Sequence, residues 1–466
     1  MKDHALTQTK LAERVKSSQP VMSRMIRSRE PFRDLDLLIK ICETLAVGDY
    51  KQYLENHDSA LALDNRSNIR YTDWTNSFKW FINPRLEGFV GREFVFQEIQ
   101  GFFDSKDRGY FTVVGDPGDG KSAIAANYLN QNPKQNSFFF NIRSGGHNTT
   151  SSFLESTCQQ LIKRYGLSLK PQPDRDWTDG SFMQRVLAGA EAKLDHDNKL
   201  ILVVDALDEA DLTQQKEYTN PLYLPQAIPK NIYFLLTRRR DKSLEERLRF
   251  DSPSKTLDLK NPRHQSDVMQ DVAKYIKNYI AADSDGSELQ QQINKFGLAL
   301  DDFCLKLYEK SQGNFMYLTL VLPEIAVGSY QDLDTIDHLP TGLINYYNEH
   351  WNLMKMDENP FKIYVIATLA KVYRPVPLQE VVRYVSQAAT DVTERMVIRA
   401  LEGWWQFLHC EQNGQEFCYQ IYHESFRDYL FNGKAEVASA CREVGNWIAD
   451  SLISRDPRKR KSLPPS

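Results

Sequence analysis

A glycine-rich segment, Gly115–Ser122, limits the folds open to this chain more than any other feature of its 466 residues. The segment reads GDPGDGKS, follows a short apolar run at residues 110–114 and precedes the helical pattern AIAANYLNQ. It matches G-x-x-x-x-G-K-[ST], the phosphate-binding loop or P-loop, which joins a buried strand to a helix. Gly115, Gly118 and Gly120 allow the backbone to curl so that successive N–H groups face phosphate oxygens. We therefore predict a strand, a P-loop and a helix in this order.

The end of the segment indicates how it would hold a nucleotide. The helix expected to begin near Lys121 contributes the positive end of its dipole, and the Lys121 ammonium would reach the β- and γ-phosphates. The Ser122 hydroxyl would bind Mg²⁺. Asp119 and Ala123 complete the P-loop residues that we expect to line the nucleotide.

A second apolar run, Leu200–Asp205, ends in a carboxylate and is followed by Ala-Leu-Asp-Glu. If the run is a buried strand, Asp205 lies at the carboxyl edge of the sheet, where it can hold Mg²⁺ through water. The next acids would then lie within reach of the attacking water. We expect Glu209 to polarise that water, with Asp208 as the alternative.

Strand-like runs at 110–114, 137–141, 200–205 and 231–237 alternate with amphipathic segments, which favours βαβ units on a parallel sheet. The last run ends in Thr-Arg-Arg-Arg. Arg238, at the end of a strand beside the P-loop, is our candidate γ-phosphate sensor. The alternative is a solvated basic loop.

The chain as a whole predicts a multidomain α/β protein in which a parallel P-loop NTPase sheet is flanked by helices. The remaining parts are all-α or end in a hairpin, since Asn-Gly at 413–414 separates two strand-like runs. The expected modules are a helix-turn-helix head (1–50), a linker (51–87), the NTPase domain (88–262), a helical lid (263–340), a winged helix (341–432) and a C-terminal helix with a disordered basic tail (433–466).

The N-terminal head reads as two helices joined by a short turn, an arrangement typical of DNA readers. Between residues 14 and 33 six basic residues accompany one acid, and this net charge of +5 suits a phosphate backbone. Residues 6–47 resemble the XRE (lambda-repressor-like) helix-turn-helix family. We predict DNA binding through residues 7–33, and the alternative is a helical adaptor whose basic face binds a protein. The expected DNA-contacting residues are Gln19, Ser23, Arg24 and Arg27.

Composition excludes several other classes of protein. The 58 basic and 62 acidic residues leave a net charge of −4, so the chain is not a polycation. No apolar run approaches the roughly 20 residues of a membrane span, and the N-terminus lacks the apolar core of a signal peptide. The six cysteines form no CxxC pair. We expect a cytoplasmic protein with free thiols and no membrane partner.

At the level of motifs, residues 88–432 resemble the NACHT branch of the STAND ATPases, a group of signalling switches that includes bacterial defence proteins. The resemblance is carried by VVDALDEA, by LLTR and by the segment Gly88–Glu93. The segment Ser311–Tyr317 resembles the lid of that family. The segment Tyr422–Leu430 resembles its winged-helix motif.

This resemblance implies that ATP or ADP, with Mg²⁺, is the cofactor. It implies further that Val90 and Arg92 border the adenine, and that His423 contacts the ADP β-phosphate in a closed state. Exchange to ATP would open the chain and allow it to form a homo-oligomer or bind an unknown protein partner, and hydrolysis would be slow. Family members often continue into long sensor repeats, whereas the 34 residues from Gly433 to Ser466 are too few for a repeat stack.

Two other functions are compatible with the same sequence. One is a transcription regulator in which nucleotide controls the oligomeric state on DNA. The other is an interaction scaffold whose ATPase is degenerate, although the intact Lys121, Asp205 and Glu209 argue against it.

Overall fold

The computed structural model describes residues 79–132, 137–141, 148–172, 176–195, 198–213, 215–216, 218–282, 288–330, 336–372, 374–413 and 416–455. The predicted helix-turn-helix head lies outside these residues, together with its proposed DNA contacts Gln19, Ser23, Arg24 and Arg27. The described residues divide into two units. The sheet unit contains those up to Thr319 and Leu339–Leu343, and the helical unit contains those of Leu320–His338 and from Ile344 onward.

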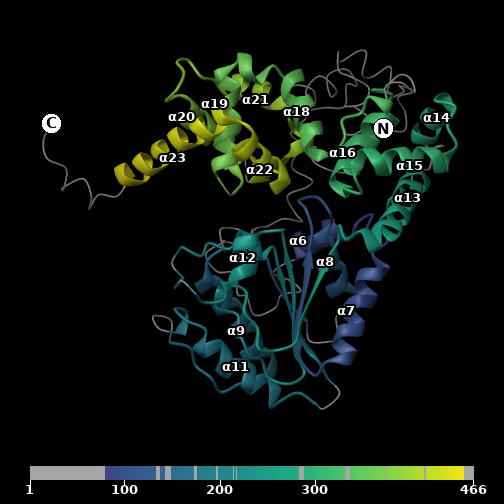
Figure 1. The fold of residues 1–466 in the computed structure, drawn as a ribbon. Coiled ribbons are helices and arrows are strands. Elements are labelled where there is room, and N and C mark those ends of the chain that lie inside the picture. Colours follow the sequence, from purple (N-terminus) through teal and green to yellow (C-terminus); the bar gives the residue numbers. More distant parts are fainter. Residues whose placement is uncertain are drawn as a thin grey trace, which may run out of the picture. The chain divides into compact units, whose positions relative to one another are not determined.

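The sheet unit is built on five strands (Figure 1). Their order is β2-β3-β4-β1-β5, and every neighbouring pair is parallel. The carboxyl ends of all five strands therefore lie along one edge of the sheet. The strands are β1 (Gly109–Val114), β2 (Ser137–Asn141), β3 (Leu200–Asp205), β4 (Ile232–Arg238) and β5 (Ser254–Asp258).

Helices cover both faces of this sheet. The helices that flank the sheet are α6 (Lys79–Leu86), α7 (Glu93–Ser105), α8 (Lys121–Gln131), α9 (Thr150–Tyr165), α11 (Ser181–Glu191) and α12 (Lys242–Arg247). Phe111 and Leu235 face the core formed with α7 and α8, whereas Leu202 and Phe234 face the core formed with α9 and α11. Since both faces are buried, β1, β3 and β4 are buried along their whole length, which explains their unbroken apolar runs.

Four helices follow β5 after a short 3₁₀ turn, η6 (Pro262–His264). They are α13 (Gln265–Ala281), α14 (Glu288–Lys295), α15 (Leu300–Ser311) and α16 (Phe315–Ala326). The first residues of α16, up to Thr319, belong to the sheet unit, and those from Leu320 onward belong to the helical unit.

The helical unit combines helices with a small antiparallel sheet of order β6-β8-β7. The predicted hairpin is present, but Asn413 ends its first strand and pairs with Glu416 instead of forming the turn. Classification of this part as a winged helix stays a prediction. The elements are α18 (Leu343–Leu353), α19 (Pro360–Lys371), β6 (Val376–Pro377), α20 (Leu378–Val385), α21 (Glu394–Glu402), β7 (Leu408–Asn413), β8 (Glu416–Ile421), α22 (Glu424–Gly433) and α23 (Ala435–Arg455).

Two elements of the sheet unit differ from the sequence expectation. Residues assigned to the end of a linker form α6, although Pro84 lies inside this helix. Strand β5 was not expected, because only Leu257 of its five residues is buried and the segment therefore has no apolar run.

The described residues contain no helix that is both long enough and apolar enough to cross a bilayer. Five of the cysteines lie in the described part, and each is a buried free thiol. No group of three or more His, Cys, Asp or Glu side chains arranged to hold a metal occurs among the described residues.

The layered core predicts a large cost for truncating a central side chain. Leu235 of β4 is fully buried between two neighbouring strands. We expect Leu235→Ala to lower the free energy of unfolding by about 2–5 kcal/mol, because it leaves a cavity. Chemical denaturation followed by fluorescence measures the change. Leu305→Ala, at a 46% exposed position of α15, is the matched control and should change stability by about 0.5 kcal/mol or less. Equal effects of the two substitutions would contradict this account of the core.

Candidate functional site

The P-loop occupies the carboxyl edge of the sheet, between β1 and the first residue of α8. Gly118 and Gly120 both have φ of +89°, a conformation that favours glycine. A Cβ at Gly118 would also lie 2.5 Å from Oδ1 of Asn314, so this glycine permits a close approach. Gly115 does not have a left-handed conformation, and an added Cβ would lie 3.1 Å from the Asp119 carboxylate. The three glycines thus serve different steric purposes.

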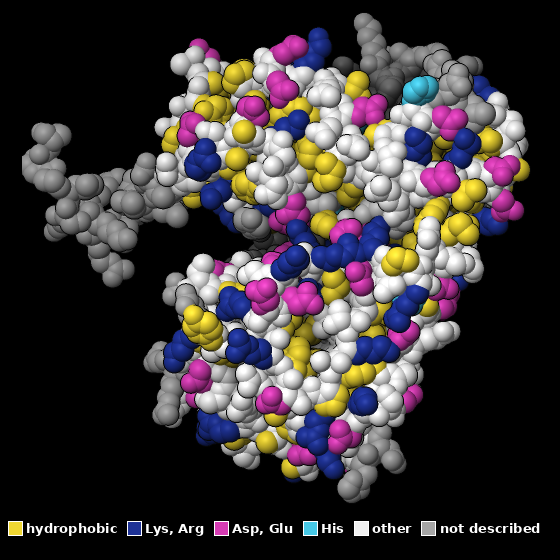
Figure 2. Space-filling model, in the orientation of Figure 1, with side chains coloured by type: hydrophobic (Ala, Val, Ile, Leu, Met, Phe, Trp, Pro, Cys, Tyr) yellow, Lys and Arg dark blue, Asp and Glu magenta, His cyan; other side chains and the backbone are white. Residues whose placement is uncertain are grey.

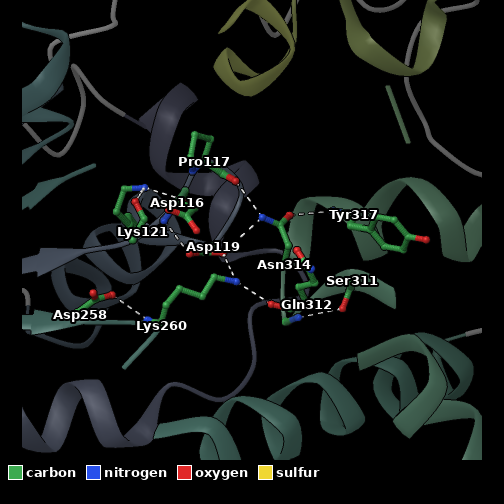
Figure 3. A network of polar contacts seen from close by, with 12 residues as sticks. Asp116, Pro117, Asp119, Lys121, Asp258, Lys260, Ser311, Gln312, Asn314 and Tyr317 are labelled. Carbon is green, nitrogen blue, oxygen red and sulfur yellow. Dashed lines mark hydrogen bonds and ion pairs between the residues drawn. The ribbon is translucent and has the colours of Figure 1, made fainter. Parts of the chain in front are cut away.

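The Lys121 ammonium lies over its own loop. Its Nζ donates to the carbonyl oxygens of Gly115 and Asp116, each at 2.9 Å (Figure 3). Lys121 is buried, while the following residues Ser122 and Ala123 are half-buried at the start of α8. The positive charge of Lys121 is thus held beside the first two residues of the loop.

Asp205 ends β3 at the same edge and is fully buried. Its Oδ1 accepts a short hydrogen bond from Thr237 of β4, whose hydroxyl oxygen in turn accepts from the N–H of Ala206 at 2.9 Å. Ala206 has φ of +59°, which turns the chain sharply into the 3₁₀ segment η4 (Leu207–Glu209). The strained turn therefore brings the two acids of η4 back to the edge where Asp205 lies.

Arg239 pairs with both of these acids. Its Nε lies 3.0 Å from the carboxylate of Asp208, and its Nη2 lies 3.1 Å from that of Glu209. The N–H of Arg239 also donates to Asp208 at 3.0 Å. Sequence reasoning missed this residue, and the only signal for it was its place in the Thr-Arg-Arg-Arg run after β4.

Arg238, the proposed γ-phosphate sensor, lies beside Val114 at the end of β4. Its guanidinium is buried, donates to the carbonyl oxygen of Arg239 at 3.0 Å and lies 3.5 Å from Glu245. Its sensing role stays a prediction.

Arg240 joins the P-loop to β5. It donates to Asp258 from two nitrogens, at 2.6 and 3.0 Å, and to Asp116 at 2.6 Å. The hydrogen bonds that Arg240 donates to Asp258 raise the pKa of Arg240. Burial alone would raise the pKa of Asp258, but the bond from Arg240 lowers it overall. Figure 2 shows Lys and Arg side chains gathered, with acids among them, at the end of the sheet unit that carries α12.

Arg92, expected at the adenine, is buried at the start of α7 with φ of +65°. Its Nη2 donates to the carbonyl oxygen of Asp119 at 2.9 Å, and its guanidinium lies 4.9 Å from the ring centre of Phe315. Burial lowers its pKa, and Asp271 and Asp119 oppose this shift. Val90 lies nearby in sequence and is half-buried.

Asn314, just before α16, and Lys260, just after β5, complete the surroundings of the P-loop. Asn314 and Lys260 both contact the Asp119 carboxylate, at 3.3 and 3.1 Å (Figure 3). Asp119 is almost fully buried, and burial raises its pKa although Lys260 opposes the shift. The Asp119 side chain thus contacts both residues, and its place in the lining of the nucleotide stays a prediction.

His423 belongs to the helical unit. There its Nδ1 accepts from the N–H of Ser425 at 3.2 Å and caps α22. The hydroxyl groups of Ser425 and Tyr347 are 2.8 Å apart. A contact of His423 with ADP stays a prediction.

The family-model match lies within the sheet unit. Residues 94–239, from α7 to the end of β4, match the family model described as nephrocystin 3, N-terminal. No curated protein is significantly similar in sequence to the chain.

Three solved structures are similar at low identity. A Walker-type ATPase of Pyrococcus abyssi is 14% identical, with 76% of this chain and 97% of that chain covered and a TM-score of 0.34. The Drosophila ORC bound to DNA is 12% identical, with 76% and 98% covered and a TM-score of 0.36. Cdc6p from Pyrobaculum aerophilum is 10% identical, with 78% and 94% covered and a TM-score of 0.32. The chain's own strand–P-loop–helix arrangement on a parallel sheet is that of a P-loop NTPase.

Proposed function

We propose that this chain is an ATP-binding signalling switch of the STAND class and NACHT type, which hydrolyses ATP slowly with the help of Mg²⁺. One observation carries the proposal: the P-loop Gly115–Ser122, Asp205 and the acids of η4 all lie at the carboxyl edge of one parallel sheet. Ligands of open parallel sheets bind at this edge.

The shape and charge of the P-loop fit a nucleotide phosphate. A Cβ added at Gly120 would meet no atom within 4 Å, so there is open space beside the N-terminus of α8. The N-terminus of a helix carries unpaired N–H groups and a partial positive charge, both of which attract phosphate. Lys121 adds a full positive charge at the same place.

The donor set also fits Mg²⁺. This ion is usually bound through one or two protein oxygens, phosphate oxygens and water. Ser122 would supply the hydroxyl, and Asp205 would act through water. When bound, Mg²⁺ supplies positive charge that bridges the phosphate oxygens.

For hydrolysis, the chain offers an acid and a cation in suitable places. Glu209, or Asp208 as the alternative, would accept the proton of the water that attacks the γ-phosphorus, and ADP and phosphate would leave. Lys121 would balance the negative charge that develops on the phosphoryl oxygens. Arg239 would keep both acids in one orientation, so we assign it as a positioning residue.

The switch itself rests on the family resemblance. Arg238 would sense the γ-phosphate, Val90 and Arg92 would border the adenine, and His423 would hold ADP in the closed state. ATP would favour an open state that forms a homo-oligomer, and the basic head would recruit DNA. Control of transcription through the nucleotide state is the alternative use of the same parts.

The central prediction separates nucleotide binding from hydrolysis. We expect Lys121→Ala to weaken ADP and ATP binding about tenfold or more, because it removes the charge that faces the phosphates. Glu209→Gln should retain binding and lower kcat by about 10²-fold or more, because the amide cannot accept a proton. Calorimetry measures binding, and release of phosphate measures turnover.

Lys295→Ala, at an exposed position of α14, is the control for the first substitution and should leave both quantities unchanged. If neither Lys121→Ala nor Glu209→Gln alters binding, turnover or assembly, the ATPase proposal fails and the scaffold alternative stands.

A second prediction concerns Arg239. We expect Arg239→Ala to lower kcat about tenfold and to change KM for ATP by about twofold or less, because the guanidinium orients the acids of η4. Arg239→Lys should recover part of kcat, since it keeps the charge. Arg185→Ala, at a 58% exposed side chain on α11, serves as the control. An increase in KM with kcat intact would mean that Arg239 acts on substrate binding instead.

The third prediction tests the switch. The full chain should be a monomer with ADP and a larger assembly with ATP, most clearly in the Glu209→Gln variant, which should retain ATP. Light scattering coupled to size-exclusion chromatography gives the mass in each state. An identical mass with both nucleotides would refute the oligomerising switch but not nucleotide binding.

A further inference from the structure

Three successive carbonyl groups of the P-loop accept hydrogen bonds from outside the loop. The side-chain amide of Asn314 donates to the oxygen of Pro117 at 2.8 Å (Figure 3). The N–H of Met316 donates to the oxygen of Gly118 at 3.2 Å, and Arg92 donates to that of Asp119 at 2.9 Å. Two of the three donors therefore lie at the start of α16.

These bonds determine where the N–H groups of the loop point. In a trans peptide the C=O and N–H groups point in opposite directions. Since the carbonyls of residues 117–119 are held from outside, the N–H groups of residues 118–120 face the interior of the loop. One of them, the N–H of Asp119, does donate across the loop to the oxygen of Asp116 at 3.2 Å. Inward N–H groups are what a phosphate requires.

The Asn314 amide accepts one hydrogen bond through its oxygen and donates another through its nitrogen. Its Oδ1 accepts from the N–H of Tyr317 at 3.1 Å, as a capping side chain does in the first turn of a helix. Its Nδ2 donates to Pro117 and lies 3.3 Å from the carboxylate of Asp119. Asn314 is buried, so both ends of the amide need partners.

Lys260 also links the P-loop to the segment that precedes α16. Its Nζ lies 3.1 Å from Oδ1 of Asp119 and donates to the carbonyl oxygen of Gln312 at 2.6 Å. Because Gly118 leaves no room for a side chain beside Asn314, the loop and the start of α16 are also in steric contact. A rotation of the peptides in the loop would therefore displace the start of the helix.

We propose that Asn314 is a positioning residue that holds the P-loop in its phosphate-binding orientation and transmits changes of the loop to α16. This inference rests on the proposed nucleotide-binding function and concerns its regulation. The helix is a suitable carrier, since its residues from Leu320 onward belong to the helical unit.

Asn314→Asp in the full chain is the sharpest test. The carboxylate still accepts from Tyr317 and still starts the helix, but it cannot donate to Pro117 and it places a negative charge beside Asp119. We expect ADP to bind about tenfold more weakly. In the wild-type chain, ADP should slow amide hydrogen exchange in both the P-loop and residues 315–326. In the variant, saturating ADP should protect the P-loop alone.

Two further variants keep the test decisive. Lys260→Met removes a partly exposed contact and should lower ADP affinity about threefold and reduce the protection of α16, even if Asn314→Asp does not fold. Asn294→Asp, at an exposed position of α14, should have no effect.

The outcomes separate the two proposals. If the wild-type chain binds no ADP, the proposed function fails and this inference fails with it. If it binds ADP, and Asn314→Asp or Lys260→Met leaves affinity and the protection of α16 at the wild-type level, only the present inference is overturned.

Discussion

The orientation of the peptide groups in the P-loop is the constraint on which the candidate site depends. Carbonyl groups at 117–119 point away from the loop because donors from two other segments hold them. At two glycines another segment approaches the backbone so closely that no side chain fits. A Cβ at Gly91 would clash with Asp271 of α13, just as one at Gly118 would clash with Asn314. Glycine thus occurs where other segments touch the chain as well as where the chain turns.

The charges at the sheet edge follow from the position of β4 between β3 and β1. Three arginines succeed each other there and each has different partners. Arg239 pairs with the acids that follow β3, and Arg240 pairs with Asp258 at the end of β5 and with the P-loop. Arg238 is buried near α12. A central strand allows neighbouring side chains to reach opposite sides of the same edge, so the run of positive charge is divided among separate acidic groups.

Sequence patterns predicted the parts of the fold that depend on local physics. Buried strands such as Leu200–Asp205 are continuous apolar runs, because helices cover both faces of the sheet. The edge strand Ser254–Asp258 was not predicted, because only Leu257 of this strand is buried and the segment has no apolar run. It pairs with β1 through backbone groups, and backbone pairing does not depend on the side-chain pattern. Likewise, Asn413 extended its strand by pairing with Glu416, although Asn-Gly favours a turn.

The sequence by itself determined the P-loop, the acid-ended strand that follows it and the alternation of strands and helices. Each of these is written in residues that are adjacent or regularly spaced, so short-range sterics and periodic burial suffice to recognise them. Only the tertiary structure decided which arginine holds the acids of η4, that Asp119 is bound by side chains, and that Asn314 reaches Pro117. Asn314 and Pro117 are 197 residues apart. A bond across such a distance arises from the folding of α16 against the loop, and no local pattern of residues encodes it.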